Sequence, residues 1–347
     1  MKKVLVLGAG GFIGSNLVNR LKAQGCFVRG VDIREPEFEP SRADEFVLAD
    51  LRQYDRVEAV CRLTSDLRYS YKRPAFSELD SFDEVYQLAA DMGGAGYIFT
   101  GAHDAAIMHN SAQINLNVLE VLAQQKYAGK VFYSSSACMY PQELQVDESN
   151  FYEGLRESDA YPANPDSEYG WEKLFSERMY FAYARNYGLN VKVARFHNIY
   201  GPLTAYDGGK EKAPAAICRK VIQAVIHKRS RLTFVPYSIE IWGDGLQARS
   251  FLEIDDCLDG IQALMQSNFS GPVNIGSSEM VTINQLAEMA IKISGHQISI
   301  THIPGPIGVR GRNSNNEVAE MELKWKPKKS LSDGLIRLYN WIESQIK

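Results

Sequence analysis

The sequence lacks an apolar run long enough to cross a membrane, and it lacks cysteines at metal-binding spacing. A membrane-spanning helix needs about 20 apolar residues, but glycines interrupt the apolar N-terminal run from Gly8 onward. The cysteines, at positions 26, 61, 138, 218 and 257, are scattered and odd in number, without a Cys-x-x-Cys pair. We therefore expect no membrane partner, no zinc site and no disulfide framework, and we predict a reducing, cytoplasmic location.

A net positive charge is also missing. The 38 Lys and Arg residues face 42 Asp and Glu residues, for a net charge of −4 at pH 7, whereas a general nucleic-acid binder needs a basic face. We expect no nucleic-acid partner, and any anionic small molecule must be met by a local basic pocket. With 347 residues, of which 45% are hydrophobic, the chain can bury one large core or two closely packed ones.

Short β-rich runs alternate with longer helical patterns over the first two hundred residues. Such alternation predicts an α/β fold with a Rossmann-type, doubly wound parallel sheet. After residue 198 the loops become rich in glycine, proline and basic residues, which indicates a smaller, interleaved α/β domain. We predict one domain over 1–198 plus about 240–271, and a second over about 199–239 plus 272–347. The predicted strands are KVLVLG, FVRGVDI, EFVLAD, EVYQLAA, KVFYSSS and VKVARF.

The stretch GAGGFIG, residues 8–14, lies between the first predicted strand and a helical pattern. Glycines there allow a tight turn and bring helix N-terminal amides close to a pyrophosphate. Asp32, at the end of the second strand, can accept hydrogen bonds from an adenosine ribose and would repel a 2′-phosphate, which favours NAD over NADP. Asp50 could border the adenine or equally cap a helix. The cofactor-binding candidates are Gly8, Gly11, Phe12, Ile13, Gly14, Asp32, Asp50 and Leu51.

The stretch YGWEK places Tyr169 and Lys173 four residues apart, hence on one face of a helix. An ammonium near a phenol stabilises the phenolate, so Tyr169 can act as a general base near neutral pH. Such a pair is weak evidence alone. Together with the glycine fingerprint and the serine-rich strand end at 134–136, it resembles the extended, sugar-nucleotide-modifying branch of the short-chain dehydrogenases/reductases, where both residues also contact NAD.

Further motifs run in order through nearly the whole chain: AADMGGAGYI, SSSACMYP, RFHNIYGP, GGKEKAPAAICRK, IWGDGLQARSF, PVNIGSSEMVTINQLAEM and HIPGPIGVRGRNS. With these motifs the chain resembles the GDP-mannose 3,5-epimerase family, within the NAD-dependent epimerases/dehydratases. The resemblance implies an isomerase that inverts C3 and C5 of GDP-mannose, to GDP-L-galactose, GDP-L-gulose or both, through a 4-keto sugar with internally recycled NAD. It also implies a homodimer built on two long helices, around 105–125 and 168–187.

The same resemblance assigns roles to residues. Tyr169 takes the proton of the C4 hydroxyl, Lys173 is its electrostatic partner, and Ser136 donates to the C4 oxygen. Cys138 and Lys212 remove and deliver protons on opposite faces of the sugar. Burial and neighbouring groups can bring the pKa of a thiol or of an amine close to 7, so either group can give or take a proton. A buried filler and a solvated loop lysine are the plainer alternatives for this pair. The substrate-binding candidates are Gly93, Asn198, Glu211, Lys212, Lys220, Gln247, Arg249 and Arg312, with the last lysine and the two arginines suited to the diphosphate.

Other functions stay open at the level of sequence. Two features oppose a GDP-L-fucose-synthase-like epimerase/reductase: Asp32 disfavours NADPH, and Lys212 of GGKEKAP occupies the position of the second acid/base. An epimerase of another GDP-sugar, such as a manno-heptose, would use the same proton-transfer residues. A noncatalytic NAD-sensing protein could dispense with them.

Two segments, 62–82 and 225–243, are longer than the family leads us to expect, and they could alter substrate reach or subunit contacts. The histidines at 103, 109 and 197 have no recognised metal-ligand spacing, so we predict no metal site.

Overall fold

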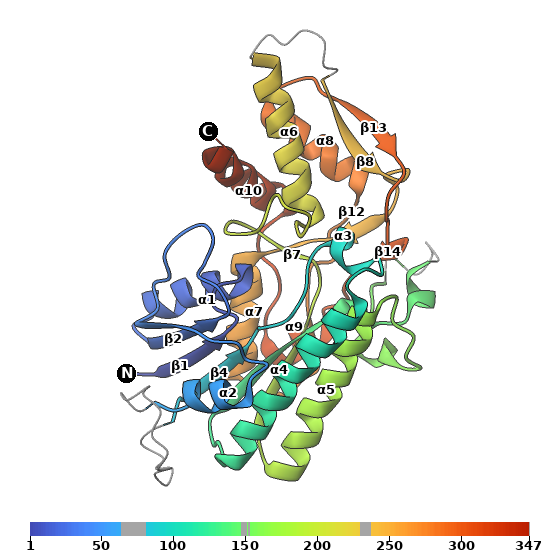
Figure 1. The fold of residues 1–347 in the computed structure, drawn as a ribbon. Helices are drawn as coiled ribbons and strands as arrows, with labels where there is room; N and C mark the ends of the chain where they lie inside the picture. Colours follow the sequence, from blue (N-terminus) through green and yellow to red (C-terminus); the bar gives the residue numbers. More distant parts are fainter. Residues whose placement is uncertain (64–80, 147–150, 152, 230–236, 347) are drawn as a thin grey trace.

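The computed structural model describes residues 1–63, 81–146, 151, 153–229 and 237–346. It has two parts: a large sheet with helices on both faces, and a smaller part that lies above it in Figure 1. Much of the two longer segments, 62–82 and 225–243, falls outside the described residues, so the roles predicted for them stay predictions.

The large sheet confirms the predicted fold class. Strands β1 to β6 are Lys3–Leu7, Phe27–Asp32, Glu45–Leu48, Glu84–Gln87, Lys130–Ser136 and Asn190–Phe196, and β11 is Val273–Ile275. All seven pair in parallel, in the order β11-β6-β5-β4-β1-β2-β3. The chain winds away from β1 in both directions, as in a Rossmann-type fold. All six strands predicted from the sequence are present.

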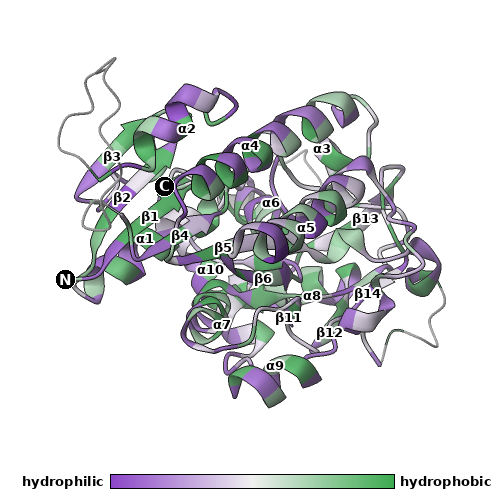
Figure 2. Ribbon diagram, turned by 90° about the horizontal axis from the view of Figure 1, so that it is seen from below, coloured by the Kyte–Doolittle hydropathy of each residue, from purple (hydrophilic) through white to green (hydrophobic). Residues whose placement is uncertain are grey.

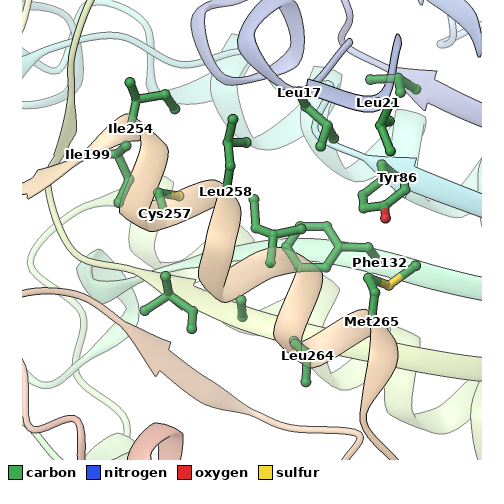
Figure 3. Packing of buried hydrophobic residues seen from close by; sticks show 14 of the residues in the cluster. Leu17, Leu21, Tyr86, Phe132, Ile199, Ile254, Cys257, Leu258, Leu264 and Met265 are labelled. Carbon is green, nitrogen blue, oxygen red and sulfur yellow. The ribbon is translucent and has the colours of Figure 1, made fainter. Parts of the chain in front are cut away.

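Helices cover both faces of this sheet because successive strand residues point to opposite sides. Val4 and Val6 pack in a cluster with α1 (Phe12–Ala23) and α7 (Ile254–Gln266), as Figure 3 shows for α7 and its neighbours. Leu5 and Leu7 pack on the other face with α2 (Tyr54–Val60), α4 (Asp104–Gln124) and α5 (Glu168–Tyr187). Figure 2 shows α4 and α5 side by side, with hydrophobic and hydrophilic residues alternating along both.

The smaller part surrounds its own hydrophobic cluster. Helices α6 (Ala213–Arg229), α8 (Ile283–Ser294) and α10 (Leu331–Ile346) meet there. Strand β8 (Ser238–Trp242) pairs with β13 (Ser299–Ile303), and β9 (Ala248–Ser250) lies between β12 (Met280–Thr282) and β14 (Gly311–Arg312). The remaining short elements are α3 (Ala95–Ile98), α9 (Glu317–Leu323), the pair β7 (Ile199–Tyr200) and β10 (Leu252–Glu253), and 3₁₀ turns at Ala137–Met139, Gln142–Gln145 and Glu157–Ala160.

Strand pairing shows where the chain passes between the two parts. Within the described residues, strands β8 and β9 pair with strands of the smaller part. Strand β11 extends the large sheet beside β6, just beyond the limit predicted at 271. The division into a cofactor-binding and a substrate-binding domain stays a prediction. None of the helices in the described residues has the length and hydropathy that a membrane span requires.

Candidate active site

A cavity of about 1030 Å³ lies at the carboxyl ends of the parallel strands, where the smaller part covers them. Ligands of open α/β sheets bind at this edge because the strand-to-helix loops converge there. The cavity collects every candidate site residue named from the sequence. They are Gly8, Gly11, Phe12, Ile13, Gly14, Asp32, Asp50, Leu51, Gly93, Ser136, Cys138, Tyr169, Lys173, Asn198, Glu211, Lys212, Lys220, Gln247, Arg249 and Arg312.

The glycine fingerprint forms a cradle that side chains would fill. Gly8 has φ +87°, and a Cβ on Gly14 would lie 2.0 Å from the Gly8 carbonyl oxygen. A Cβ on Gly10, which the sequence did not single out, would lie 2.5 Å from the Arg34 carbonyl oxygen. Gly11 caps α1 without any side-chain hydrogen bond to the helix amides. Those amides therefore remain available to an anion, and the cradle fits the pyrophosphate of a dinucleotide.

Asp32 is oriented by backbone amides at the end of β2. Its Oδ2 accepts from the Gly10 amide at 2.9 Å and its Oδ1 from the Ile33 amide at 2.7 Å. Each carboxylate oxygen has further lone pairs, so both can also accept from ribose hydroxyls. The residues present thus fit an adenosine dinucleotide.

Asp50 does not cap α2, whose N-cap is Gln53. Its carboxylate instead binds Arg52 through Nη2 at 2.7 Å, and this hydrogen bond lowers the pKa of Asp50. The charge of Asp50 is thus paired with Arg52. The predicted contact of Asp50 with adenine stays a prediction.

Helix α5 delivers Tyr169 and Lys173 to the cavity. The Lys173 Nζ donates to the Ser134 carbonyl at 2.9 Å and lies 5.8 Å from the centroid of the Tyr169 ring. Burial raises the pKa of Tyr169, whereas a hydrogen bond with Ser136 lowers it. Burial also lowers the pKa of Lys173. In the chain alone the pKa of Tyr169 therefore lies above its ordinary value, because desolvation of the phenol is the largest effect on it. The predicted stabilisation of the phenolate by Lys173 stays a prediction.

Cys138 differs from the other cysteines of the described residues. It is partly exposed, whereas Cys26, Cys61, Cys218 and Cys257 are buried. Its amide donates to the Ser136 hydroxyl at 3.2 Å, which begins a 3₁₀ turn directly after β5. Its sulfur lines the cavity and accepts a hydrogen bond from Arg312 Nη1 at 3.0 Å, which favours the proton-transfer role over the filler alternative.

Lys212 enters the cavity just before α6. Burial lowers the pKa of Lys212, and Cys138, when ionised, raises it. Within the described residues its Nζ makes no hydrogen bond or ion pair, so the amine is free to meet a ligand. Glu211 stabilises the loop itself. One of its carboxylate oxygens accepts a hydrogen bond from the Gly209 amide at 2.6 Å, and the other accepts one from Arg219 at 3.4 Å.

The neighbouring glycine segment positions the Lys212 loop. The Gly94 amide donates to the Lys210 carbonyl at 3.0 Å, and a Cβ on Gly94 would lie 2.1 Å from the Glu211 carbonyl oxygen. A Cβ on Gly93 would lie 2.6 Å from Tyr97. These glycines thus allow the backbone of one segment to approach the other.

Two of the three cations predicted for the diphosphate donate only to carbonyl groups in the described residues. Lys220 donates to Glu240 at 2.6 Å, and Arg249 donates to carbonyls of its own strand and of the segment before β14. Burial lowers the pKa of Arg249 to about 9, and the charge of Arg312 adds to this effect. Neither cation is neutralised by an ion pair there, as suits an anion-binding pocket.

Polar contacts place two further candidates at the cavity wall. Asn198, with φ +47°, donates to the Ser250 carbonyl at 2.9 Å. Gln247 donates to the Trp242 carbonyl at 3.1 Å, and its buried Oε1 has no partner in the described residues. That orphaned oxygen is suited to accept a hydrogen bond from a ligand.

Comparison with known proteins identifies the family. Residues 4–276 match the model of the NAD dependent epimerase/dehydratase family. GDP-mannose 3,5-epimerase 1 of Oryza sativa subsp. indica is 42% identical, over 99% of this chain and 82% of that protein. GDP-mannose 3,5-epimerase of Arabidopsis thaliana is 41% identical, over 99% and 83%. This chain belongs to the GDP-mannose 3,5-epimerase family.

Solved structures agree with this membership. UDP-glucuronic acid 4-epimerase from Bacillus cereus, in complex with UDP-glucuronic acid and NAD, is 26% identical, with a TM-score of 0.75 over 99% of this chain and 100% of that one. UDP-glucose 4-epimerase from Thermotoga maritima has the same fold, with a TM-score of 0.81. It is 24% identical, over 99% of this chain and 100% of that one. The predicted family and enzyme class, an epimerase of the isomerases, are confirmed.

Sequence reasoning missed the residues that support this epimerase site. Gly10, Gly94, Gln145, Asp166 and Gly170 hold loops or side chains of the site through contacts across long sequence separations. Asp166 resembles an ordinary turn residue before a helix, and the glycines outside the fingerprint have no motif of their own. No signal in a single sequence distinguishes them.

Proposed function

We propose that this chain inverts C3 and C5 of GDP-mannose, giving GDP-L-galactose, GDP-L-gulose or both. The observation that carries the proposal is that Cys138 and Lys212, which lie in different parts of the fold, line the cavity that also holds Tyr169 and Ser136. Relatives of 41–42% identity that are named for this activity support it. The cavity thus holds one set of groups for C4 and another for the neighbouring carbons.

The C4 oxygen of the sugar is handled by Tyr169 and Ser136. When bound, NAD supplies the hydride acceptor for oxidation at C4 and the hydride donor for the reverse step. Tyr169 takes the hydroxyl proton, and Ser136, which lines the same cavity, donates to the same oxygen. Lys173 contributes a positive charge 5.8 Å from the Tyr169 ring centroid. We expect NAD rather than NADP because the Asp32 carboxylate would repel a 2′-phosphate.

A ketone at C4 acidifies the hydrogens on C3 and C5, and inversion needs two groups on opposite faces of the ring. Cys138 as thiolate removes a proton from one face, and Lys212 as ammonium delivers a proton to the other. Because a thiol and an amine can each give or take a proton near neutrality, the same pair serves both carbons.

The remaining candidates bind the GDP-sugar. Lys220 and Arg249 are placed to meet the diphosphate, and the unpartnered Gln247 Oε1 to accept from a hydroxyl or an amine. We also propose a homodimer in which α4 and α5 meet the same helices of a second copy. Exposed aromatic side chains on α5, Trp171 at 39% and Phe175 at 44%, support this surface.

The deciding experiment is incubation of the purified protein with GDP-mannose in deuterium oxide. We expect deuterium at both C3 and C5 and the appearance of the two product sugars. Absence of deuterium at both carbons would exclude the proposal. Net consumption of NADPH with a 4-keto-6-deoxy GDP-sugar would instead indicate a fucose-synthase-like reductase.

A further inference from the structure

Arg312 is held by three different side chains at the wall of the cavity. Its Nε donates to Gln145 Oε1 at 2.5 Å, its Nη1 to Cys138 Sγ at 3.0 Å and its Nη2 to Asp166 Oδ2 at 2.9 Å. The Arg312 and Asp166 side chains are only 5% and 6% exposed. A guanidinium bound on all three nitrogens has a fixed orientation, and here one edge points at sulfur.

The two anchors of Arg312 are themselves fixed. Gln145 is fully buried and donates through Nε2 to the carbonyls of Tyr140 and Pro141, both at 3.1 Å. Asp166 lies immediately before Ser167, the N-cap of α5, and its Oδ1 accepts from the Ser167 hydroxyl at 3.2 Å. The arrangement is therefore rigid before any substrate binds.

We propose that Arg312 is a positioning residue for Cys138: held by Asp166 and Gln145, it directs Sγ into the cavity and stabilises the thiolate. The inference rests on the proposed function. In the step it serves, the Cys138 thiolate takes a proton from C3 or C5. The S–H bond forms as the C–H bond breaks, and the C–H electron pair moves toward the C4 ketone oxygen to give an enolate. Arg312 stabilises the sulfur charge before that step.

Other charged groups also act on Cys138, from several elements. Tyr169 and Lys173 lie on α5, Lys212 precedes α6, and Arg249 lies on β9. Asp166 is the carboxylate that binds Arg312 directly. Within the described residues, Arg312 is the cation that makes a hydrogen bond to the sulfur. A guanidinium has five N–H groups, so Arg312 keeps two with which it can also meet the diphosphate.

The test measures thiol reactivity without any sugar. Iodoacetamide alkylates Cys138 when Sγ attacks its methylene carbon and iodide leaves, and only the thiolate reacts fast. The double variant R312Q/D166N removes both charges of the buried pair, which avoids an uncompensated buried charge and keeps the net charge. R312K keeps a cation that cannot reach all three partners. Cys138→Ser reports background labelling of the four buried cysteines.

We expect R312Q/D166N holoenzyme to be alkylated about tenfold more slowly than wild type at pH 7. At pH 9.5, where a thiol ionises without help, the two rates should be within about twofold. R312K should fall between the two at pH 7. Arg310→Gln, on the same segment but paired with Asp244, should match wild type.

Alkylation of R312Q/D166N and R312K at the wild-type rate at pH 7 would overturn the inference, because a role confined to the diphosphate predicts that result. Loss of deuterium exchange from GDP-mannose in both variants, with NAD retained, would support it further. If wild type itself exchanges no deuterium, the proposed function fails, yet the alkylation rates still decide whether Arg312 controls this thiol.

Discussion

Gly170 lies directly against the backbone of Cys138. A Cβ on Gly170 would come 2.1 Å from the Cys138 carbonyl oxygen and 2.7 Å from the Cβ of Pro165. The first turn of α5, which carries Tyr169, therefore packs on the peptide that carries the thiol. This backbone contact fixes the proposed general base, Tyr169, relative to the proposed proton-transfer residue, Cys138.

Gly170→Ala should damage the site although it removes none of the proposed functional side chains. In an open helix position this change stabilises a protein by about 1 kcal/mol, but here the methyl group must displace Cys138 or the start of α5. We expect deuterium exchange to fall at least about tenfold, since small misplacements of reacting groups are costly, with NAD retained. Glu168→Ala, at an exposed position of the same turn, is the control, and equal exchange in both variants would refute the coupling.

Gly94→Ala should displace the Lys212 loop, because its Cβ would lie 2.1 Å from the Glu211 carbonyl oxygen. Gly96→Ala is a matched control, since its Cβ would make an ordinary contact with Trp242 at 3.4 Å. We expect the first variant to lose about tenfold or more in epimerisation rate and the second to stay near wild type. Rates from product analysis by chromatography, at saturating GDP-mannose, compare the two. Equal losses would mean that general damage to α3 is responsible.

Asp32→Ser should change the choice of cofactor. The substitution removes the charge that opposes a 2′-phosphate and the acceptors for ribose hydroxyls. We expect NAD to bind about tenfold more weakly, a loss of about 1.4 kcal/mol, and NADP binding to become measurable by calorimetry. Binding of NADP by wild type as tightly as NAD would contradict the role given to this carboxylate.

His197 should make the protein sensitive to acid. Burial lowers the pKa of His197 to about 3. The ring is fully buried, and its Nε2 forms a hydrogen bond with Asn274 Oδ1 at 3.0 Å. The folded state keeps the ring neutral while the unfolded chain takes up a proton below about pH 6.5. The stabilising contribution is therefore complete above that pH and is lost as the pH falls from there toward 3.

The magnitude follows from proton linkage, at about 1.4 kcal/mol per pH unit over that range. Relative to pH 7, the free energy of unfolding of wild type should thus fall by about 2 kcal/mol more than that of His197→Gln at pH 5. Glutamine keeps a donor for Asn274 and does not titrate. Urea unfolding at both pH values measures the difference, and parallel losses in the two proteins would disprove it.

The exposed aromatics of α5 should mediate dimerisation. Trp171 and Phe175 lie one helical turn apart and are 39% and 44% exposed. The double variant W171E/F175E places two charges on the proposed interface and should shift a dimer to a monomer in size-exclusion chromatography with light scattering. Met321→Glu, at a 62% exposed position on α9, should leave the mass unchanged. A dimeric W171E/F175E protein would place the interface elsewhere.

The fold was predictable because its signals are local. The runs from KVLVLG to VKVARF are short, β-rich and separated by helical patterns, and they became β1 to β6. The domain limits stay a prediction, because they depend on pairing between distant segments, such as that of the three-residue strand β11 with β6. Pairing between distant segments leaves no periodic pattern in the sequence.

The site was partly predictable for the same reason. Residues that belong to spaced motifs, such as the glycine fingerprint and the Tyr169–Lys173 pair, were found, and they line one cavity. The pKa values of these groups were not predictable in the same way. Burial raises the pKa of Tyr169, and the spacing of residues in a motif does not report burial.

The sequence by itself determined the sheet, the cofactor cradle and the set of chemical groups, because strand alternation, glycine geometry and residue type act over a few neighbouring positions. Only the tertiary structure decided which groups meet. Arg312 contacts Cys138 and Asp166 across 174 and 146 positions of the chain, and Gly170 admits the Cys138 carbonyl. Those contacts depend on how separate elements pack and on which charges lose water, and neither is encoded in a local pattern.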